Sequence, residues 1–314
     1  MTRKNWLITG GTGSFGRALT ERVLDNDLAR RLVIFSRDEK KQQTMRAEFD
    51  DPRIRFILGD VRDLAQLKLA LQGVDVVFHA AALKQIDRSA LDVVEFIKTN
   101  VIGTMNVLAA CHACDVKRAI VLSSDKACAS STPYGATKAL AEWLAISSNV
   151  YGSTRISATR YGNVVGSRGS VLELWQRQYD AGAPLTITTE QMTRFWMTID
   201  DAVDLALLAL ERGRGGEVFI PHDVRRGRVL DFAKMHFPDA AGWRYVGKRA
   251  YEKTHEMLIA PEEADRVRDC GDVLVLLPHP ELVRWEPLPY GMAEGEGLPV
   301  AKVVKDFQYR SDDR

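Results

Sequence analysis

The chain has 314 residues, of which 46% are hydrophobic and 27% are charged. This length allows one large or two medium-sized domains with a substantial core. The 43 basic and 42 acidic residues leave a formal net charge of +1, which gives no electrostatic argument for binding nucleic acid or an anionic membrane. Any phosphate group must therefore be bound by a local cluster of donors.

No targeting or membrane segment is evident in the sequence. The first residues lead directly into a strand-like segment, and no apolar run approaches the roughly 20 residues of a membrane span. Four cysteines in a chain of this length do not form a disulfide framework, so we expect a cytoplasmic protein. Cys111 and Cys114 have the spacing of a metal or redox pair, but they lie in an apolar helical pattern without a second pair. We expect them to pack in the core and expect no metal site.

Short apolar strands alternate with helical patterns in the first half of the chain. Strands are expected at 5–9, 32–35, 54–58, 74–78 and 119–122. Their continuous apolar character is typical of a parallel sheet with both faces covered by helices. The repeated order predicts an α/β fold of the Rossmann type, with a doubly wound parallel sheet. Ligands of such a sheet bind beyond the carboxyl ends of the strands.

A glycine-rich loop follows the first strand and opens the first helix. Glycines there permit a tight turn and a close approach of the backbone to a pyrophosphate, and the helix N-terminus offers free N–H groups and a positive dipole. We therefore predict a dinucleotide-binding site at this loop. The residues assigned to it are Gly10, Thr12, Gly13, Ser14, Phe15 and Gly16.

The end of the second strand selects between the two nicotinamide dinucleotides. An acidic residue there hydrogen-bonds the ribose hydroxyls of NAD, whereas a basic residue accommodates the 2′-phosphate of NADP. Ser36 and Arg37, with Lys41 nearby, favour NADP. Asp38 keeps NAD possible as the less favoured cofactor.

Two further strand ends complete the expected cofactor site. Asp60 and Val61 follow the third strand and are placed to hold the adenine. Ala80, Ala81 and Ala82 follow the fourth strand, where small side chains let the nicotinamide ribose lie close.

The candidate catalytic residues follow the fifth strand. A proline is suited to open the next helix, which would place Tyr134 and Lys138 on one helix face. Because a nearby cation lowers the pKa of a phenol, we expect Tyr134 to take a proton from an alcohol near neutral pH. Ser124 could bond the same substrate oxygen, and Asp125 and Lys126 add an acid and a base beside it. The Tyr-x-x-x-Lys spacing alone is a weak signal, since an ordinary helix with a packed tyrosine and an exposed lysine fits it too.

Together these motifs make the chain resemble the extended short-chain dehydrogenase/reductase superfamily. More narrowly, the chain is similar to the inverting UDP-N-acetylglucosamine 4,6-dehydratases of the pseudaminic acid pathway. The Lys126 that follows Asp125 replaces the glutamate of retaining relatives and is that family's mark of inversion at C5. The resemblance runs from residue 7 to about residue 309 and is carried by residues 8–16, 36–39, 59–63, 79–84, 97–100, 160–171, 192–196 and 252–256.

The resemblance implies a reaction. Tyr134, within the set Ser124, Tyr134 and Lys138, takes the proton of the sugar 4-hydroxyl while a hydride leaves C4 for NADP. Lys126, with a pKa lowered by partial desolvation, removes the C5 proton, and a protonated Asp125 gives its proton to the departing 6-hydroxyl. The hydride returns to C6, C5 is reprotonated on the other face, and the cofactor stays bound between turnovers.

The resemblance also assigns binding residues. It extends the cofactor set by Lys84, Asn100, Leu122, Ser123, Tyr134, Lys138, Tyr161, Asn163 and Val164. It assigns the nucleotide-sugar to Lys84, Asn163, Arg168, Val171, Arg194, Arg249 and Glu252. Arginine suits a diphosphate because its planar fork donates two hydrogen bonds to one anion.

We expect residues 1–165 to form the NADP-binding Rossmann domain and residues 166–314 a smaller α/β substrate domain. Residues 190–215 are expected to return to the first domain. The expected partners are a nucleotide-sugar substrate, with UDP-N-acetylglucosamine favoured, and further copies of the chain in a homo-oligomer, a dimer or a hexamer.

The chain departs from the family pattern beside the active site. The family commonly has His-Val-Pro after Lys84 and Ala-Asn-Pro after Ala127, where this chain has Gln-Ile-Asp at 85–87 and Cys-Ala-Ser at 128–130. These changes spare the proton-transfer residues but alter the pocket around them, so they leave the exact sugar open.

Two other functions stay open. One is a nucleotide-sugar C4 epimerase that oxidises C4 and eliminates nothing, against which the Asp125–Lys126 pair argues. The other is a non-catalytic NADP-binding regulator, against which the intact Ser124, Tyr134 and Lys138 set argues.

Overall fold

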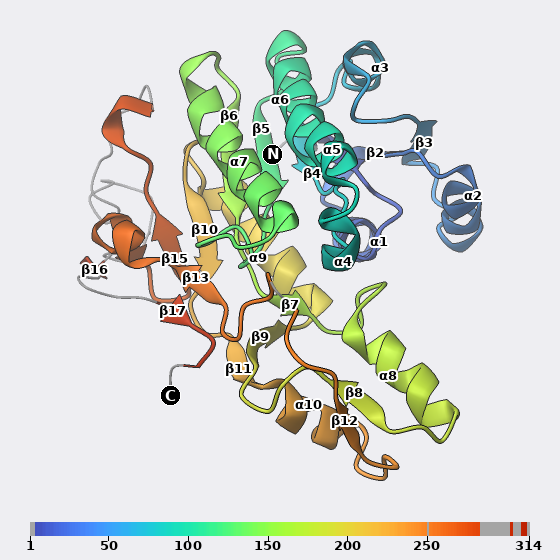
Figure 1. The fold of residues 1–314 in the computed structure, drawn as a ribbon. Helices are drawn as coiled ribbons and strands as arrows, with labels where there is room; N and C mark the ends of the chain where they lie inside the picture. The colour runs from blue at the N-terminus through green and yellow to red at the C-terminus, as the bar shows by residue number, and fades with distance from the viewer. Residues whose placement is uncertain (1–3, 250, 283–301, 304–308, 313–314) are drawn as a thin grey trace.

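A ten-stranded sheet forms the centre of the molecule (Figure 1). The computed structural model describes residues 4–249, 251–282, 302–303 and 309–312 of the chain. Within these residues, the parallel part of the sheet runs in the order β3 (Ile54–Leu58), β2 (Ala29–Ser36), β1 (Lys4–Thr9), β4 (Val76–His79), β5 (Arg118–Leu122), β6 (Arg155–Thr159) and β10 (Val218–Pro221).

The predicted α/β fold with a doubly wound parallel sheet is confirmed, and the five expected strands correspond to β1 to β5. The sequence pattern does not predict β6 and β10. In β6 the apolar run is broken by Ser157 and Thr159, which are nevertheless buried. Ser157 is satisfied there because its hydroxyl donates a 2.8 Å hydrogen bond to Glu217.

Residues of the C-terminal half extend this sheet beyond β10. The added strands are antiparallel to their neighbours and comprise β15 (Val273–Leu276), β14 (Val267–Asp269) and β16 (Lys302–Val303). The helix α9 (Ile199–Arg212) packs on the sheet against β5, β6 and α1 (Ser14–Asp25). The division into residues 1–165 and 166–314 stays a prediction.

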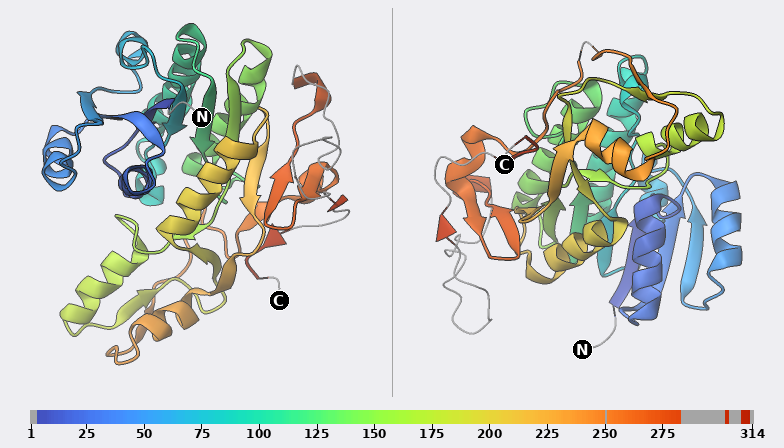
Figure 2. Two further views of the ribbon diagram at one scale, coloured as in Figure 1. Left: turned by 180° about the vertical axis from the view of Figure 1, so that it is seen from behind. Right: turned by 90° about the horizontal axis from the view of Figure 1, so that it is seen from below.

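Helices cover both faces of the sheet, as Figures 1 and 2 show. In β1, Trp6 and Ile8 pack on one face with α1 and α9, whereas Leu7 packs on the other. Cys111 is fully buried on the second face, as predicted, and Cys114 is half-buried. The remaining helices of these layers are α2 (Glu39–Glu48) on the first face, and α3 (Leu64–Ala70), α6 (Gly103–Ala113) and α7 (Pro133–Ser147) on the second.

One helical run corrects the expectation that no segment approaches a membrane span. Residues Val93–Ala113 form a continuous 21-residue helix from α5 (Val93–Phe96), the π-helical η1 (Ile97–Ile102) and α6. An 18-residue window of it has a mean hydropathy of 1.2, which reaches the length and composition of a span. Polar residues interrupt the apolar run in this segment, but its mean hydropathy stays high. Of this window 44% is buried, and α6 packs against α3 and α7 as a core helix does.

A smaller lobe lies beyond the carboxyl ends of the parallel strands (Figure 1). In its core, Trp196 stacks on Phe232 with ring centroids 3.9 Å apart, and Trp175 is fully buried. Its elements are β7 (Asn163–Val164), α8 (Val171–Asp180), β8 (Leu185–Ile187), β9 (Thr193–Met197), β11 (Arg225–Arg228), α10 (Val229–His236) and β12 (Trp243–Tyr245).

A buried ion network ties the elements around the site together. Arg160, directly after β6, donates two hydrogen bonds to Glu142 of α7 and two to Glu263. Such a fork-to-carboxylate arrangement fixes geometry as well as charge.

The remaining short elements are α4 (Ile86–Ser89), η2 (Ser148–Val150), β13 (Met257–Ile259), η3 (Pro261–Arg266), η4 (Pro280–Leu282) and β17 (Tyr309–Arg310), of which β13 and β17 pair.

Candidate active site

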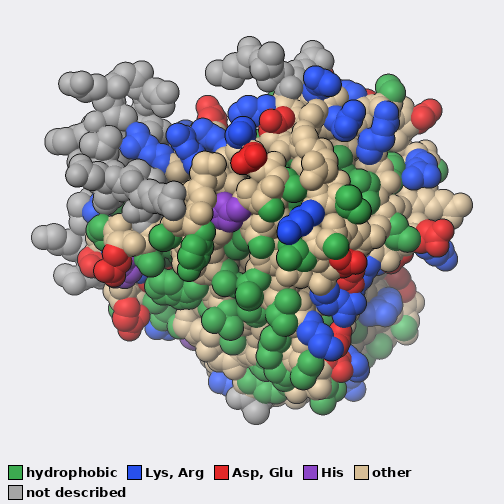
Figure 3. Space-filling view, turned by 90° about the horizontal axis from the view of Figure 1, so that it is seen from above, with side chains coloured by type: hydrophobic (Ala, Val, Ile, Leu, Met, Phe, Trp, Pro, Cys, Tyr) green, Lys and Arg blue, Asp and Glu red, His purple; other side chains and the backbone are tan. Residues whose placement is uncertain are grey.

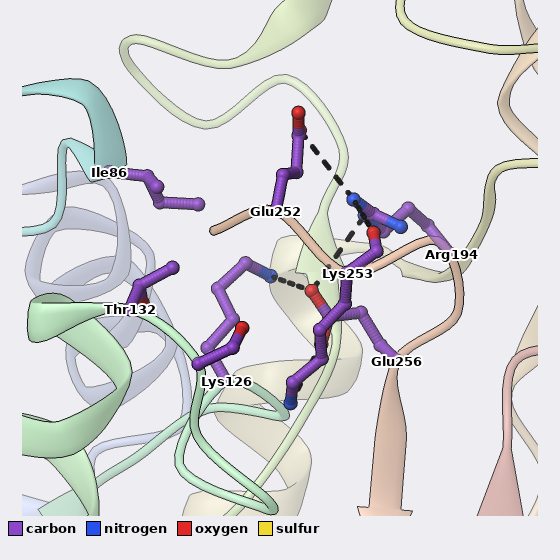
Figure 4. A pocket seen from close by; sticks show the side chains of 8 residues that line it. Ile86, Lys126, Thr132, Arg194, Glu252, Lys253 and Glu256 are labelled. Carbon is purple, nitrogen blue, oxygen red and sulfur yellow. Dashed lines mark hydrogen bonds and ion pairs between the residues drawn. The ribbon is translucent and has the colours of Figure 1, made fainter. Parts of the chain in front are cut away.

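A small pocket opens between the loop after β5 and the segment that precedes β13. Figure 4 shows that side chains from the two sides point toward one another across it. The residues that line it are Ile86, Lys126, Ser131 and Thr132 on one side, and Arg194, Glu252, Lys253 and Glu256 on the other.

The glycine loop has the geometry of a phosphate cradle. Gly10 has a φ of 64°, and a Cβ on it would lie 2.8 Å from the backbone nitrogen of Ala81. A Cβ on Gly16 would lie 2.4 Å from the carbonyl oxygen of Gly11. The N-cap of α1 is Gly13, with no side-chain cap and no acidic residue in the first turn. This N-terminus therefore presents free N–H groups, and the residues fit the pyrophosphate of a dinucleotide.

The loop that precedes α8 lies over the glycine loop. The N–H of Arg168 donates to the Ser14 hydroxyl at 3.2 Å, and Lys84 Nζ donates to the Ser167 hydroxyl at 3.4 Å. The charge of Arg168 also helps to lower the pKa of Asp38, after the larger contribution of Lys41. Arg168, assigned to the nucleotide-sugar in the sequence, is thus placed beside the expected cofactor site.

After β2, the Asp38 carboxylate is bound by Lys41 in the first turn of α2. Its Oδ1 accepts the Lys41 N–H at 2.9 Å as the N-cap of α2, and its Oδ2 pairs with Lys41 Nζ at 2.9 Å. Arg37 is about half exposed, and its closest ionic partner is Asp60 at 4.0 Å. The Ser36 hydroxyl accepts a 3.1 Å hydrogen bond from Gln42.

The loop after β4 is braced from η1 by Asn100. The Asn100 side chain accepts the Leu83 N–H at 2.8 Å and donates to the Leu83 carbonyl at 2.9 Å. It also donates to the hydroxyl of Thr137 in α7 at 3.0 Å. Asn100 is 1% exposed. Its hydrogen bonds to Leu83 hold the loop that carries Ala81 and Lys84.

His79 anchors the start of the same loop. Its Nδ1 lies 2.7 Å from the Thr9 hydroxyl and its Nε2 lies 2.9 Å from the Thr104 hydroxyl. Burial lowers the pKa of His79 to about 3, with a smaller contribution from Lys138. The ring is therefore neutral near pH 7 and serves as a hydrogen-bonding brace.

The remaining predicted cofactor residues are mostly buried around this loop. Val61 and Leu122 are buried in the cores on the two opposite faces of the sheet, and Tyr161 packs on the same face as Leu122. The Ser123 hydroxyl is buried without a hydrogen-bond partner among the described residues. Val164 likewise packs against the core, at the start of the smaller lobe.

The loop after β5 brings Ser124, Asp125 and Lys126 into one hydrogen-bonded group. Asp125 Oδ1 accepts the Ser124 hydroxyl at 2.8 Å and Lys126 Nζ at 2.9 Å. Lys126 Nζ also donates to Asn163 Oδ1 at 2.9 Å. Asp125 is fully buried, and its Oδ2 has no hydrogen-bond partner among the described residues.

Tyr134 and Lys138 lie on α7 next to this loop. The helix begins at the predicted proline, and the Thr132 hydroxyl caps it by accepting the Gly135 N–H at 2.9 Å. Lys138 Nζ donates to the Leu122 carbonyl. Burial lowers the pKa of Lys138 to about 8, against an opposing effect of Glu142.

The expectation of a lowered pKa for Tyr134 is wrong. Burial raises the pKa of Tyr134 and outweighs the lowering effects of the Lys126 charge and the Ser124 hydrogen bond. The cation that lowers the pKa of the phenol is Lys126, whereas the Lys138 ammonium is directed to the Leu122 carbonyl. Sequence spacing places the lysine on the correct helix, but it does not show that Lys138 is directed to a backbone carbonyl.

The expectation of a lowered pKa for Lys126 is also wrong. Burial does lower it, but the charges of Asp125 and Glu256 outweigh burial, and the pKa of Lys126 is raised. Lys126 Nζ lies 2.9 Å from Asp125 and 3.9 Å from Glu256. Two carboxylates this close favour the ammonium form more strongly than desolvation disfavours it.

Three of the predicted nucleotide-sugar residues, Arg194, Glu252 and Arg249, have different surroundings. Arg194 is 6% exposed and donates to the carbonyls of Thr193, Lys253 and Thr254 at 2.7–3.1 Å. Glu252 lies 3.7 Å from Arg194. Arg249 is about half exposed and pairs with Asp87 of α4 at 2.6 Å, which links the two sides of the pocket.

Sequence reasoning missed Lys253 and Glu256 as site residues. Lys253 Nζ donates to the Cys128 carbonyl at 2.6 Å and lies 3.4 Å from Glu256. Their signal was present in the motif at 252–256, of which only Glu252 received a role. The described residues hold no group of three His, Cys, Asp or Glu side chains arranged for a metal ion.

Comparisons with known proteins place this site in a family. The model of the family described as "Polysaccharide biosynthesis protein" matches residues 6–278. The chain is 40% identical over 315 residues to a Campylobacter jejuni protein named UDP-N-acetylglucosamine 4,6-dehydratase (inverting), covering 99% of this chain and 93% of that one. It is 44% identical over 277 residues to a Rickettsia bellii protein named UDP-glucose 4-epimerase, covering 86% and 81%.

A solved structure shares the architecture. The X-ray structure of Pen from Bacillus thuringiensis superposes with a TM-score of 0.89 at 32% identity, covering 99% of this chain and 93% of that one. The resemblance inferred from the motifs is confirmed by the near full-length match to the inverting dehydratase. The chain belongs to the polysaccharide biosynthesis protein family.

Proposed function

We propose that the protein is a nucleotide-sugar 4,6-dehydratase that inverts C5, acts on UDP-N-acetylglucosamine or a close relative, and uses NADP. The observation that carries this proposal is the 2.9 Å hydrogen bond between Lys126 Nζ and the fully buried Asp125, at the wall of the pocket. An acid and a base joined in this way suit the removal of a proton and a hydroxyl from neighbouring carbons.

The first half of the reaction is oxidation at C4. The Tyr134 phenolate takes the proton of the sugar 4-hydroxyl and becomes the phenol, and the Ser124 hydroxyl holds the same oxygen. A nicotinamide dinucleotide bound at the glycine loop would supply the acceptor for the C4 hydride and the donor of a hydride to C6. Burial raises the pKa of Tyr134, and the nearby cation of Lys126 opposes this rise and so favours the phenolate.

The second half is elimination of water, carried by the Asp125–Lys126 pair. At rest the pair holds one proton, on Lys126, whose pKa is raised. Transfer of this proton along the 2.9 Å hydrogen bond leaves an acid on Asp125 and a neutral amine on Lys126. The amine then takes the C5 proton, which the C4 ketone has made acidic. Asp125 gives its proton to the 6-hydroxyl, which leaves as water.

The residues that follow β2 favour NADP over NAD as the cofactor. Both oxygens of Asp38 are engaged by the backbone and side chain of Lys41, so this carboxylate is not directed toward a ribose. The half-exposed Arg37 guanidinium is available for a 2′-phosphate.

The relative named as an epimerase keeps C4 epimerisation as the alternative. An epimerase of this chemistry oxidises and reduces C4 only, and it needs no acid and base at C5 and C6. Incubation with UDP-N-acetylglucosamine and no added cofactor, followed by mass spectrometry, separates the two. Dehydration gives a product lighter by one water, whereas epimerisation gives an isomer of the same mass. Product of unchanged mass would replace our proposal by the epimerase, and recovery of unchanged substrate would refute both.

We also propose that the protein forms a homo-oligomer through the helical face around α6 and α7. Figure 3 shows hydrophobic side chains gathered on one side of the molecule. The exposed apolar side chains of α5, η1, α6 and α7 include Val94, Ile97, Met105, Leu140 and Trp143, each 40–61% exposed. Contiguous apolar patches mark interaction sites. A change of Trp143 to Arg should lower the molar mass in light scattering, and an unchanged mass would exclude this face.

A cytoplasmic location stays part of the proposal. All four cysteines are free in the structure, as expected for a protein of a reducing compartment.

A further inference from the structure

Glu256 faces Lys126 across the pocket and has no part in the steps described above. Its side chain is 3% exposed, and its Oε1 lies 3.9 Å from Lys126 Nζ. Its Oε2 has no hydrogen-bond partner among the described residues. Figure 4 shows the two side chains directed toward each other. A buried carboxylate is costly unless nearby charges compensate it, so its position beside Lys126 calls for an explanation.

The position of Glu256 is fixed from both sides. Its N–H donates to the Ser311 hydroxyl at 2.9 Å, and its carbonyl accepts the Ser311 N–H at 2.9 Å. Lys253 lies 3.4 Å from its Oε2 and is itself held by the Cys128 carbonyl. The backbone of Glu256 is therefore anchored by Ser311, and Lys253 helps to hold its buried carboxylate beside Lys126.

The charged groups around Lys126 come from several elements. Asp125 lies beside it in the same loop at 2.9 Å, and Tyr134 approaches from α7. Arg194 of β9 lies 3.9 Å from Glu256 and acts on Lys126 in the opposite sense. The charges of Asp125 and Glu256 outweigh burial and Arg194, so the pKa of Lys126 is raised.

We propose that Glu256 is a positioning residue that retains the shared proton on the Asp125–Lys126 pair and so sets the alkaline limit of dehydration. This inference rests on the proposed function. In the elimination the C5–H bond breaks and its proton goes to the Lys126 amine, while the Asp125 proton goes to the 6-hydroxyl, which departs as water. A pair that has lost its proton to solvent can still remove the C5 proton, but it has no acid for the leaving group.

The test compares the rate of dehydration against pH for the cofactor-loaded wild type and Glu256→Gln. Loss of the carboxylate charge lowers the pKa of Lys126, so the pair loses its proton at lower pH. The alkaline fall in rate should therefore move down by about one to three pH units, the range for two charges about 4 Å apart between water and a protein surface. Glu256→Asp keeps the charge and should show a smaller shift.

Glu262→Gln is the matched control. Glu262 lies in the exposed first turn of η3, and its substitution changes charge and size in the same way. It should leave the alkaline limit unchanged. An alkaline limit in Glu256→Gln equal to that of the wild type would overturn the proposal. If Glu256→Gln does not fold, Glu256→Ala, which also removes the charge, takes its place, and an alkaline limit equal to that of the wild type would overturn the proposal.

A titration that needs no turnover separates this inference from the proposed function. In holoprotein labelled with ¹³C-lysine, the Lys126 signal is the one that disappears in Lys126→Met. Its midpoint should be lower in Glu256→Gln than in the wild type. A wild type that forms no dehydrated product refutes the proposed function, yet the titration still decides the role of Glu256. Equal midpoints would refute that role even if dehydration occurs.

Discussion

The glycine loop and the proton-transfer pocket are built in different ways. Every group of the phosphate cradle comes from residues 10–16 and the adjoining strand ends, and it works through backbone N–H groups and tight contacts. The pocket joins Lys126 to Glu256, 130 positions further along the chain, through side-chain charges. A local motif is therefore enough to predict the cradle. In the pocket, a motif places a residue, but the partners brought by the fold decide its proton affinity.

The largest expected effect is at Tyr134, on α7 beside the loop that carries Lys126. Tyr134→Phe removes the proton acceptor at C4 but keeps the ring that packs against Phe96. Turnover should fall by about 10²-fold or more, as for a lost general acid–base group. Initial rates by product analysis measure this. Tyr151→Phe is the control, because Tyr151 is 78% exposed and away from the pocket. Equal rates for wild type and Tyr134→Phe would remove the phenol from the mechanism.

A smaller effect is expected in the cofactor region. Arg37→Ala should weaken NADP about tenfold or more, since a charged hydrogen bond to the 2′-phosphate is lost, and it should change NAD affinity little. Dissociation constants of both cofactors give the ratio. Asp38→Ala should leave this ratio unchanged because the carboxylate caps α2. Selective loss of NAD affinity in Asp38→Ala would show instead that Asp38 holds the ribose, as an NAD enzyme requires.

The smallest effect is expected at the rim of the pocket. Asp87 pairs with Arg249 at 2.6 Å, and both side chains are more than half exposed. An exposed ion pair contributes little, about 0–1 kcal/mol. If Arg249 binds the diphosphate, Asp87→Asn should free it and tighten UDP binding by no more than about fivefold. Calorimetry with UDP measures this, and weaker binding in Asp87→Asn would contradict it.

Much of the fold follows from patterns in the sequence. The strands β1 to β5 are continuous apolar runs, and α7 begins at the predicted proline under a threonine cap. The strand β6 escapes prediction because Ser157 is buried only through its bond to Glu217, a partner 60 residues away. The antiparallel strands β14 and β15 lie outside the alternating order of strands and helices on which the prediction rests.

Several residues of the candidate site could be predicted from the sequence, but the pKa values of their side chains could not. Ser124, Asp125 and Lys126 lie together as the sequence indicates. The raised pKa of Lys126 depends on Glu256 as well as Asp125, and no pattern in the sequence specifies a distance between segments so far apart. Likewise, the amide partner of Lys126 is Asn163, which follows β6 in the chain.

Reaction in deuterated water tests the central claim most directly, because it follows the C5 proton itself. With UDP-N-acetylglucosamine, the wild type should give a 4-keto-6-deoxy product that carries deuterium at C5 in the inverted configuration. Lys126→Met should still bind cofactor and substrate but should show neither C5 exchange nor loss of water by NMR. Retained configuration, or a Lys126→Met enzyme that dehydrates at the wild-type rate, would show that the Asp125–Lys126 pair does not perform this chemistry.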